Sequence, residues 1–359
     1  MDLLEQHDDK CIGSMLHLNY CGYTESDLCN NDILRRYSQM IQYLYLKRNR
    51  IKSLSMVISQ FPCLIQLHLE GNSIEELPQE IGGLKYLEIL NVVSNNLTTL
   101  PRDIGDLQSL RVLQICNNRI TSLPNELGKL CCLETLEASR NCLPFIPLTL
   151  SSCCKLKLLA LDKNCIRQFP RQLCWLQNIK DISLAGNELE YLPPVIFKGL
   201  TSLECIVLDS NPRLHALPTH TTQQSVHVSS RLDKSRSDLF TYLNVRGEYF
   251  PLPREIKQYC VPHQSCVPCL EELVLQLLHR NIKQTSDIYK LPLPSDVKDH
   301  LVYPTAYCLQ CNQPIFISAF PVIYSSTDFT LPVIEFFCSR HCTLQHSFHG
   351  NQVRFPDSL

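Results

Sequence analysis

The chain has 359 residues, of which 44% are hydrophobic and 19% charged, and its 33 basic and 35 acidic residues give a net charge of −2. This composition excludes a largely disordered chain, a collagen-like repeat and a chain-wide basic surface for nucleic acid. At about 150 residues per domain, the length favours two or three domains. The sequence contains no run of 18 apolar residues and begins with an acidic segment, so we expect neither a transmembrane helix nor a secretory signal.

The chain contains twenty cysteines, which is too few to indicate a disulfide scaffold. Without a secretory signal, we expect a cytoplasmic protein with reduced thiols, and a nuclear location is the alternative. Most of these cysteines should be small buried apolar residues, whereas a closely spaced subset can bind a metal.

A repeated leucine frame occupies the first half of the chain. The frame reads L-x-x-L-x-L-x-x-N-x-L-x-x-L-P, and its asparagines recur every 23 residues, with a final interval of 24. This period indicates a solenoid in which each unit contributes a short strand and stacked units share one apolar core. An amide at the end of each strand can pair with backbone groups of the turn, so we interpret all eight asparagines as structural. The frame asparagines are Asn49, Asn72, Asn95, Asn118, Asn141, Asn164, Asn187 and Asn211.

The segments between the strands read LPQEIGGLKYL, LPRDIGDLQSL and LPNELGKLCCL. Over residues 41–218 this pattern resembles the intracellular class of leucine-rich repeat proteins that includes Ras-pathway scaffolds. The resemblance implies a curved protein-binding scaffold with no chemistry of its own. We therefore predict an α/β fold, a leucine-rich repeat solenoid with short parallel strands on its concave face, followed by a small helical box and a cysteine-rich, zinc-ribbon-like domain.

The predicted organisation has five parts. An N-terminal cap with a degenerate repeat, marked by Leu16 and Leu18, should close the solenoid, because an open end exposes apolar core. Eight repeats follow, and a linker rich in Ser, Thr and Gln separates them from the C-terminal parts. The cap, repeats, linker, helical SOCS-box-like segment and zinc-ribbon-like domain span residues 1–40, 41–218, 219–237, 238–303 and 304–349.

The positions around each strand predict a concave binding face. Its charges have mixed signs, which disfavours a polyanionic ligand. A merely solvated face is the alternative, but extended concave solenoid surfaces generally bind proteins. The predicted substrate face consists of Lys47, His68, Glu70, Glu88, Asn91, Arg111, Gln114, Glu134, Glu137, Lys157, Asp162 and Lys180.

Residues 268–282, PCLEELVLQLLHRNI, predict an amphipathic helix that Pro268 can begin. The pattern alone also fits a helix packed against the end of the solenoid. Residues 288–301, IYKLPLPSDVKDHL, then predict an extended turn at the two prolines and a second short helix. The apolar positions of the first helix, at i, i+3, i+4, i+7 and i+8, are Leu270, Leu273, Val274, Leu277 and Leu278.

This arrangement of a helix, a Leu-Pro-Leu-Pro elbow and a second helix resembles a SOCS box, the module that recruits a cullin ubiquitin ligase. The resemblance implies binding to Elongin B/C and cullin-5. Two positions depart from the family pattern, because Val274 replaces the usual cysteine and His300 replaces the usual aromatic residue. The implied Elongin-binding residues are Leu270, Val274 and Leu278, and the implied cullin-binding residues are Ile288, Leu291, Pro292, Leu293, Pro294 and Leu301.

Two cysteine pairs near the C-terminus predict a metal site. Cys308 and Cys311 form a C-x-x-C pair, and Cys338 and Cys342 form a C-x-x-x-C pair 26 residues later (338 − 311 − 1). This spacing suits a structural, tetrahedral Zn²⁺ site that would staple a domain with too little core of its own. His341 is a substitute ligand in this scheme. Four unliganded thiols are the alternative.

The sequence contains no P-loop, G-x-G-x-x-G, G-x-S-x-G or H-E-x-x-H motif, so we predict no enzyme activity. One reading is a substrate receptor of an Elongin B/C–cullin-5 ligase, whose solenoid binds the substrate. The other is a passive repeat scaffold or signalling adaptor, in which the helix is buried and the C-terminal part is only a cap. The two differ in whether Leu270 and Leu291 face solvent.

Overall fold

The computed structural model describes residues 11–12, 14–54, 58–218, 225–227, 242–245, 248–251, 256, 258–259, 270–282, 285–324, 333–345 and 353–354. Most of the predicted linker lies outside these residues. The described residues form two compact units. The first comprises 11–166, 176–187 and 202–207, and the second comprises 167–175, 188–201 and the described residues from 208 onward.

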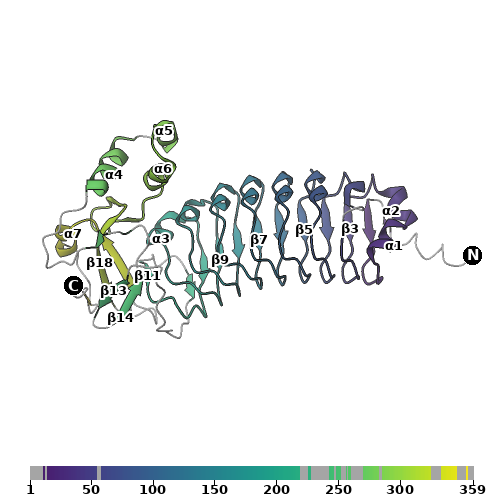
Figure 1. Ribbon diagram of the computed structural model, residues 1–359, viewed down its shortest axis with the longest axis horizontal. Helices are drawn as coiled ribbons and strands as arrows, with labels where there is room; N and C mark the ends of the chain where they lie inside the picture. The colour runs from purple at the N-terminus through teal and green to yellow at the C-terminus, as the bar shows by residue number, and fades with distance from the viewer. Residues whose placement is uncertain are drawn as a thin grey trace, which may run out of the picture. The chain divides into compact units, whose positions relative to one another are not determined.

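A parallel sheet runs through the first unit (Figure 1). Nine strands, β2 to β10, are paired in sequence order, and each Leu of one strand lies beside the equivalent residue of the next, as Leu44 does beside Leu67. The central residue of each is buried because it points into the solenoid. The strands are β2 (Met15–His17), β3 (Tyr43–Tyr45), β4 (Gln66–His68), β5 (Ile89–Asn91), β6 (Val112–Gln114), β7 (Thr135–Glu137), β8 (Leu158–Ala160), β9 (Asp181–Ser183) and β10 (Cys205–Val207).

The N-terminal part of this unit continues the sheet. Strand β1 (Cys11–Ile12) pairs antiparallel with β2, and β2 pairs in parallel with β3. Leu16 and Leu18 are fully buried, and two short helices follow, α1 (Glu25–Cys29) and α2 (Asp32–Tyr37). These apolar residues therefore extend the leucine frame one unit beyond the first complete repeat.

Short 3₁₀ helices form the side of the repeats opposite the strands. A proline precedes η3, η4, η5 and η6, because its fixed φ suits the entry to a helical turn, and the first three of these prolines are extended. At Gly105 an added Cβ would lie 2.4 Å from the carbonyl oxygen of Glu126 in the next repeat, so only glycine permits this spacing. The helices in this unit are η2 (Ile58–Gln60), η3 (Gln79–Gly83), η4 (Arg102–Asp106), η5 (Asn125–Lys129) and η6 (Leu148–Ser152).

The frame asparagines form a buried hydrogen-bond ladder. The Asn118 side chain donates to the carbonyl oxygens of Val92 (3.0 Å) and Ile115 (3.1 Å) and accepts the backbone N–H of Leu97 (3.0 Å). Equivalent bonds recur at Asn72, Asn95 and Asn141. The structural role predicted for these amides is confirmed.

The second unit contains a mixed sheet and a group of helices. Strands β11 (Leu217–Pro218), β19 (Val333–Phe337), β18 (Ser318–Tyr324) and β15 (Gln258–Tyr259) are adjacent in that order, and β20 (Val353–Arg354) also pairs with β18. Strands β16 (Ala306–Tyr307) and β17 (Pro314–Ile315) form a short hairpin. The helices are η7 (Arg171–Trp175), α3 (Ile196–Gly199), α4 (Leu270–Asn281), α5 (Thr285–Lys290), α6 (Ser295–Val302) and α7 (Arg340–Gln345).

Within the predicted helical range 238–303, the described residues include strands as well as helices. Strands β13 (Tyr242–Val245) and β14 (Glu248–Pro251) form an antiparallel hairpin within it, and β12 (Ser225–His227) precedes them. The hairpin residues YLNV and EYFP include β-branched and aromatic residues, which favour strands. The described helices of this segment begin at Leu270.

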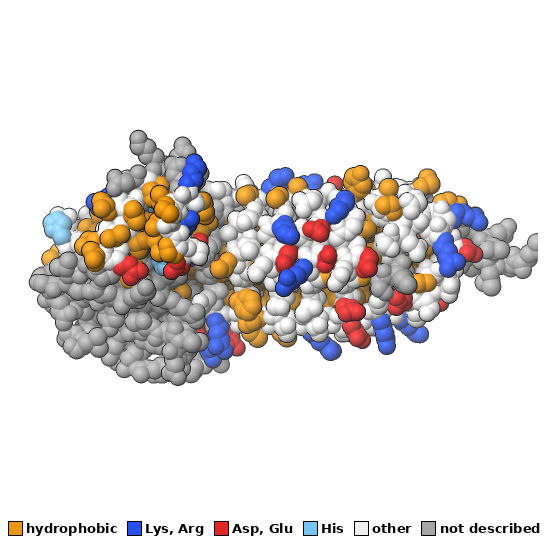
Figure 2. Space-filling view, turned by 45° about the horizontal axis from the view of Figure 1, so that its top comes forward, with side chains coloured by type: hydrophobic (Ala, Val, Ile, Leu, Met, Phe, Trp, Pro, Cys, Tyr) orange, Lys and Arg blue, Asp and Glu red, His pale blue; other side chains and the backbone are white. Residues whose placement is uncertain are grey.

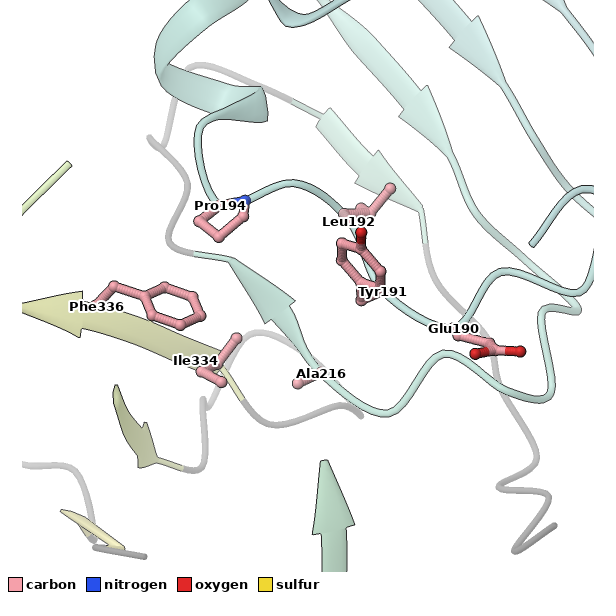
Figure 3. A pocket seen from close by; sticks show the side chains of 7 residues that line it. All are labelled: Glu190, Tyr191, Leu192, Pro194, Ala216, Ile334 and Phe336. Atoms are coloured by element: carbon pink, nitrogen blue, oxygen red, sulfur yellow. The ribbon is translucent and has the colours of Figure 1, made fainter. Parts of the chain in front are cut away.

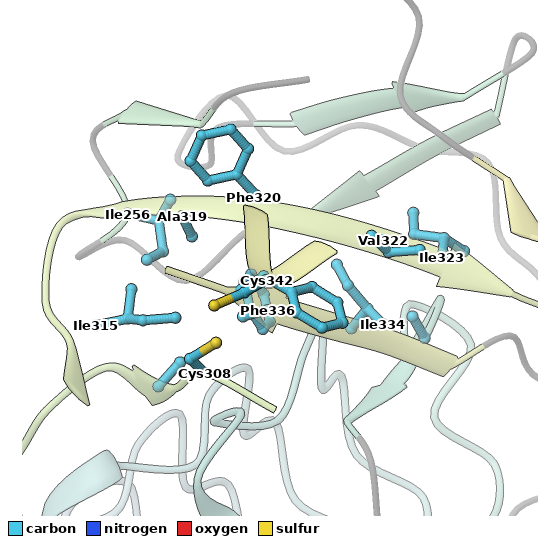
Figure 4. Packing of buried hydrophobic residues seen from close by; sticks show 13 residues of the cluster. Ile256, Cys308, Ile315, Ala319, Phe320, Val322, Ile323, Ile334, Phe336 and Cys342 are labelled. Atoms are coloured by element: carbon cyan, nitrogen blue, oxygen red, sulfur yellow. The ribbon is translucent and has the colours of Figure 1, made fainter. Parts of the chain in front are cut away.

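Two apolar cores lie in the second unit. The ribbon core packs residues of β18 and β19 with Cys308 and Cys342 (Figure 4). The helix core lies beneath α4, α5 and α6 and contains Leu275, Ile288, Leu301, Phe316 and Ile317. Ile315 belongs to the ribbon core and its neighbours Phe316 and Ile317 to the helix core, so one short segment joins the two.

Candidate metal centre and interaction surfaces

The two cysteine pairs meet at one point of the second unit. The sulfur atoms of Cys308, Cys311, Cys338 and Cys342 all lie within 4.8 Å of one another. The Cys311 and Cys338 sulfurs are 3.4 Å apart, and those of Cys338 and Cys342 are 3.7 Å apart. At a Zn–S distance of about 2.3 Å, a tetrahedral site places its sulfurs about 3.8 Å apart. The four thiols therefore fit a metal of the Zn²⁺ class.

Two tight turns position these thiols. The first pair lies in the turn of the β16–β17 hairpin, where the Cys308 N–H donates to the Gln313 carbonyl (2.8 Å) and the Asn312 N–H donates to the Cys308 carbonyl (2.9 Å). Asn312 adopts a positive φ of 60°, which asparagine tolerates. In the second pair, Cys338 follows β19 and Cys342 lies in α7. A strand–turn–strand and a strand–turn–helix thus face each other across the sulfurs.

The thiols strongly affect one another's ionisation. A hydrogen bond from Cys338 lowers the pKa of Cys308 to about 4, and the same interaction raises the pKa of Cys338. Burial raises the pKa of Cys311. These shifts favour the thiolate form at Cys308 over the thiolate forms at Cys311 and Cys338. A bound cation would stabilise all four thiolates, because metal ligation requires the deprotonated form. His341 is exposed and is not part of this group, so the described geometry favours four cysteine ligands.

Lys198 lies close to this centre, and the sequence pattern did not predict this position. Its ammonium group contacts the Asn312 side chain and lies 4.2 Å from the centre of the Tyr307 ring. Burial lowers the pKa of Lys198. This contact links α3 to the turn that carries the first cysteine pair, a pairing that no local sequence signal predicts.

Helix α4 exposes an apolar stripe. The exposed fractions are 76% for Leu270, 43% for Leu273, 45% for Val274 and 61% for Leu277, so the side chains at i, i+3, i+4 and i+7 all reach solvent. Tyr289 of α5 is also exposed, and Figure 2 shows hydrophobic side chains gathered over the helical part of this unit. Such a contiguous apolar patch is typical of an interaction site.

Other residues of the two predicted boxes have a different role. Ile288 and Leu301, which the prediction assigned to cullin binding, are buried in the helix core, and Leu278, which it assigned to Elongin binding, packs partly against that core. They pack inward because the short helices must bury apolar area against Phe316 and Ile317. In the elbow, Pro292 and Pro294 are exposed, whereas Leu291 and Leu293 are partly buried.

The predicted substrate face lies on the strand side of the first unit. All twelve side chains are exposed or partly exposed. The structure pairs most of their charges with one another: Glu134 contacts Arg111 (2.7 Å) and Lys157 (2.6 Å) in the adjacent repeats, and Lys47 contacts Glu70. Figure 2 shows the resulting interleaved acidic and basic side chains on the solenoid. The face therefore carries little unbalanced charge.

Three aromatic rings lie together on this face, and the predicted face included only one of them, His68. The Tyr45 ring stacks between His17 (4.5 Å between ring centres) and His68 (4.8 Å). Burial lowers the pKa of His68, so the neutral imidazole is favoured near pH 7. The sequence could have predicted this stack, since the three aromatic residues occupy the last position of successive strands. Rigid aromatic groups of this kind are enriched at protein interfaces.

A cavity in the second unit is too small for a substrate. It is lined by Glu190, Tyr191, Leu192, Pro194, Ala216, Ile334 and Phe336, and Figure 3 shows these side chains around it. Its volume of about 10 Å³ accommodates about one water molecule. The cavity therefore does not suggest an active site. In the described part of the chain, no helix has the length and apolar character needed to cross a membrane.

A model of a leucine-rich repeat region matches residues 65–146, the central repeats of the first unit. These central repeats match a leucine-rich repeat region, and the repeats on either side continue the same frame. Similar solved structures include a plant peptide hormone receptor in complex with its hormone, which is 20% identical and has a TM-score of 0.45 over 53% of this chain and 33% of that one. An Arabidopsis thaliana receptor kinase ectodomain is 26% identical, with a TM-score of 0.45 over 52% of this chain and 24% of that one.

An internalin from Listeria monocytogenes is 24% identical, with a TM-score of 0.43 over 55% of this chain and 52% of that one. The chain thus covers between about a quarter and about half of the length of these three structures. The leucine-rich repeat is generally a non-catalytic scaffold for protein interactions.

Proposed function

We propose that this protein is a substrate receptor of an Elongin B/C–cullin-5 ubiquitin ligase. In this proposal the concave face of the solenoid binds the substrate, α4 docks Elongin C, and the Leu-Pro-Leu-Pro elbow with α6 contacts cullin-5. The protein transfers no ubiquitin itself. The observation that carries the proposal is the exposed stripe of Leu270, Leu273, Val274 and Leu277 on α4.

The stripe fits helix-in-groove recognition, in which apolar side chains at i, i+3, i+4 and i+7 enter a groove on the partner. Leu270 is the most exposed of the four and is the residue that the Elongin-binding pattern places in the partner's pocket. Burying one leucine side chain contributes about 1.5–3 kcal/mol. Replacing Leu270 by aspartate should therefore lower the affinity for Elongin B/C at least about tenfold.

On the substrate side, the paired charges of the concave face favour a partner with mixed or low charge. Glu134 is already paired with both Arg111 and Lys157, so a polyanion would have to compete with this carboxylate for the two cations. The stacked rings of His17, Tyr45 and His68 supply a rigid aromatic anchor at the N-terminal end of the face.

A second candidate function is a passive repeat scaffold or signalling adaptor with no ligase link. The burial of Ile288 and Leu301 favours it, because a cap domain also requires these residues inward. Under this alternative the α4 stripe has no role in recruiting a ligase.

The deciding experiment is co-purification of the tagged full chain from cells, with Elongin B, Elongin C and cullin-5 quantified. The wild type is compared with Leu270→Asp, with the double variant Leu291→Ala/Pro292→Ala and with the control Tyr86→Asp, which changes a similarly exposed side chain of the solenoid. We expect Leu270→Asp to lose all three proteins, the elbow variant to lose only cullin-5 and the control to retain all three. A folded wild type that retains none of them contradicts the proposal and favours the scaffold.

A further inference from the structure

Residues 313–318 connect the metal centre to the helix core. At one end, the Gln313 carbonyl accepts the N–H of Cys308, which fixes this segment to the first cysteine pair. In its middle, Phe316 and Ile317 fill the helix core beneath α4. At the other end, Ser318 begins strand β18. One short segment therefore joins the hairpin that carries Cys308 and Cys311 to the residues on which α4 rests.

The inner face of α4 is held to this segment by polar contacts. The Glu272 carboxylate has an exposed fraction of 0% and accepts three consecutive backbone N–H groups, from Phe316 (3.1 Å), Ile317 (2.5 Å) and Ser318 (3.0 Å). One turn further on, the Gln276 side chain donates to the Pro314 carbonyl (3.4 Å). We call this set of contacts the Glu272 latch.

The last turn of α4 adds a contact to the same segment. The Arg280 guanidinium donates twice to the Gln313 side-chain oxygen, at 3.1 Å and 2.7 Å. We include this contact of Arg280 in the Glu272 latch. Glu272, Gln276 and Arg280 are spaced four residues apart and share one face of the helix. The exposed apolar stripe occupies another face, so the latch fixes which side of α4 faces solvent.

The latch depends on an element that is weak by itself. Its three N–H groups converge on one carboxylate only while residues 316–318 hold a fixed turn between β17 and β18. The adjoining β16–β17 hairpin has strands of two residues each, and such a hairpin is marginal in water without further support. Closure of the four cysteines around a metal supplies that support, because binding free energy at a structural site is also folding free energy.

We propose that metal binding at the four-cysteine centre controls the presentation of the α4 apolar stripe, and that Glu272 is the positioning residue that couples the two. With metal bound, the latch holds α4 against the helix core with the stripe outward. Without metal, residues 313–318 lose their turn and α4 is released. The identity of the docking partner rests on the proposed function above, whereas the coupling between metal and helix does not.

The test uses the full chain loaded with Zn²⁺ and the same chain stripped by a chelator. Hydrogen exchange is measured on peptides covering α4 and, as an internal reference, on peptides covering β5 to β7 of the solenoid. Zinc content and affinity for purified Elongin B/C are measured on the same samples. The variants are Cys311→Ser, which removes the most exposed metal ligand, and Glu272→Gln. Their matched controls are Cys154→Ser, an exposed solenoid cysteine, and Glu271→Gln, the exposed neighbour on α4.

Stripping the metal and Cys311→Ser should each accelerate exchange in α4 at least about tenfold while leaving the solenoid peptides unchanged. Glu272→Gln should retain zinc yet show the same acceleration, a result that damage to the metal site cannot produce. Both control variants should behave as wild type. Elongin B/C affinity should fall at least about tenfold wherever α4 exchange rises.

Unchanged α4 exchange after metal removal, or a chain that takes up no zinc, overturns the proposal. Wild-type exchange and affinity in zinc-loaded Glu272→Gln overturn the role of Glu272. Metal-dependent α4 exchange in a chain that never binds Elongin B/C supports the coupling and contradicts the ligase function. Full Elongin B/C affinity in the stripped chain contradicts the coupling and supports the ligase function.

Discussion

Two rows of polar residues run along the solenoid, one buried and one at the surface. The buried frame asparagines satisfy backbone groups that would otherwise lose their hydrogen bonds on leaving water. The surface row, with Glu134 between Arg111 and Lys157, pairs charges from adjacent repeats. The two rows differ in energetic importance, because an unsatisfied buried group costs far more than a broken ion pair in water.

Replacing Asn118 by alanine should lower the free energy of unfolding by about 2–4 kcal/mol, since it leaves several buried backbone groups without partners. Urea denaturation measures the change. Asn96→Ala is the matched control, because the Asn96 side chain is only partly buried, and it should change stability by less than about 1 kcal/mol. Equal losses for the two variants would show that the buried ladder has no special role.

The contribution of Glu134 to stability should depend on pH. Hydrogen bonds from Lys157 and Arg111 lower its pKa below the ordinary value of 4.5. A lowered carboxyl pKa stabilises the fold above the unfolded pKa, and this contribution is lost as pH falls through the folded pKa. The difference in Tm between wild type and Glu134→Gln should therefore be small but measurable at pH 7 and should shrink as the pH is lowered through the folded pKa. A difference that grows on acidification contradicts this assignment.

At the scale of elements, the spacing of the repeats is limited by the approach of one 3₁₀ helix to the next. Gly82, Gly105 and Gly128 occupy equivalent positions where a Cβ would collide with backbone of the following repeat, at 2.7, 2.4 and 2.4 Å. The recurrent glycine in LPxxIGxL is thus required by packing between repeats. Gly83, which follows Gly82 in η3, differs because an added Cβ there would have no other atom within 4 Å.

Gly105→Ala should destabilise the protein by about 1–3 kcal/mol, because the new methyl group forces two repeats apart. Gly83→Ala, one helix earlier, should be neutral or slightly stabilising, since alanine restricts the unfolded chain. Thermal unfolding of the two variants provides the comparison. A neutral Gly105→Ala would mean that the repeats can separate without cost.

Helix α4 has one apolar face that is buried in the helix core and one that is exposed to solvent. Leu275 is 5% exposed and belongs to the helix core, whereas Leu277 is 61% exposed. Leu275→Ala should therefore lower the stability of the second unit by about 2–5 kcal/mol. Leu277→Ala should leave stability within about 0.5 kcal/mol of wild type. Chemical denaturation, followed by hydrogen exchange of α4, distinguishes the two variants. A larger loss of stability in Leu277→Ala than in Leu275→Ala would contradict our assignment of the faces.

At the scale of the whole molecule, the chain combines a repeat region with a unit that contains a candidate metal centre. Repeats in a solenoid are stabilised by their neighbours over a long shared core. The second unit has two smaller cores joined through residues 314–320 and four cysteines at one end. Its stability should therefore depend on the metal, whereas that of the first unit should not.

Metal removal should lower the unfolding temperature of the second unit by many degrees and leave the transition of the first unit in place. The physical reason is that a ligand bound only to the folded state stabilises it in proportion to its binding free energy. Calorimetry with and without a chelator tests this, with Cys308→Ser as an independent removal of the site. A single transition that is insensitive to chelation contradicts a structural metal.

Features that depend on short-range spacing could be predicted from the sequence, whereas burial that depends on distant contacts could not. The repeat period predicted the strands and the buried asparagines because one residue in 23 has the same surroundings each time. The cysteine spacing predicted which four thiols would meet, since each pair lies in its own tight turn. In the helical box, however, the pattern placed Leu278, Ile288 and Leu301 at a partner surface, and the structure buries Ile288 and Leu301 and packs Leu278 partly against the same core.

Short-range spacing was enough to predict the leucine-rich repeat solenoid and the four cysteines of the candidate metal centre. Which face of α4 is exposed, how the charges on the strand side pair and what holds the helix in place depend on contacts that form only in the folded chain. The Glu272 carboxylate binds backbone N–H groups 44 to 46 residues away. Contacts over such separations depend on where the ribbon and helix cores meet, which no local pattern encodes.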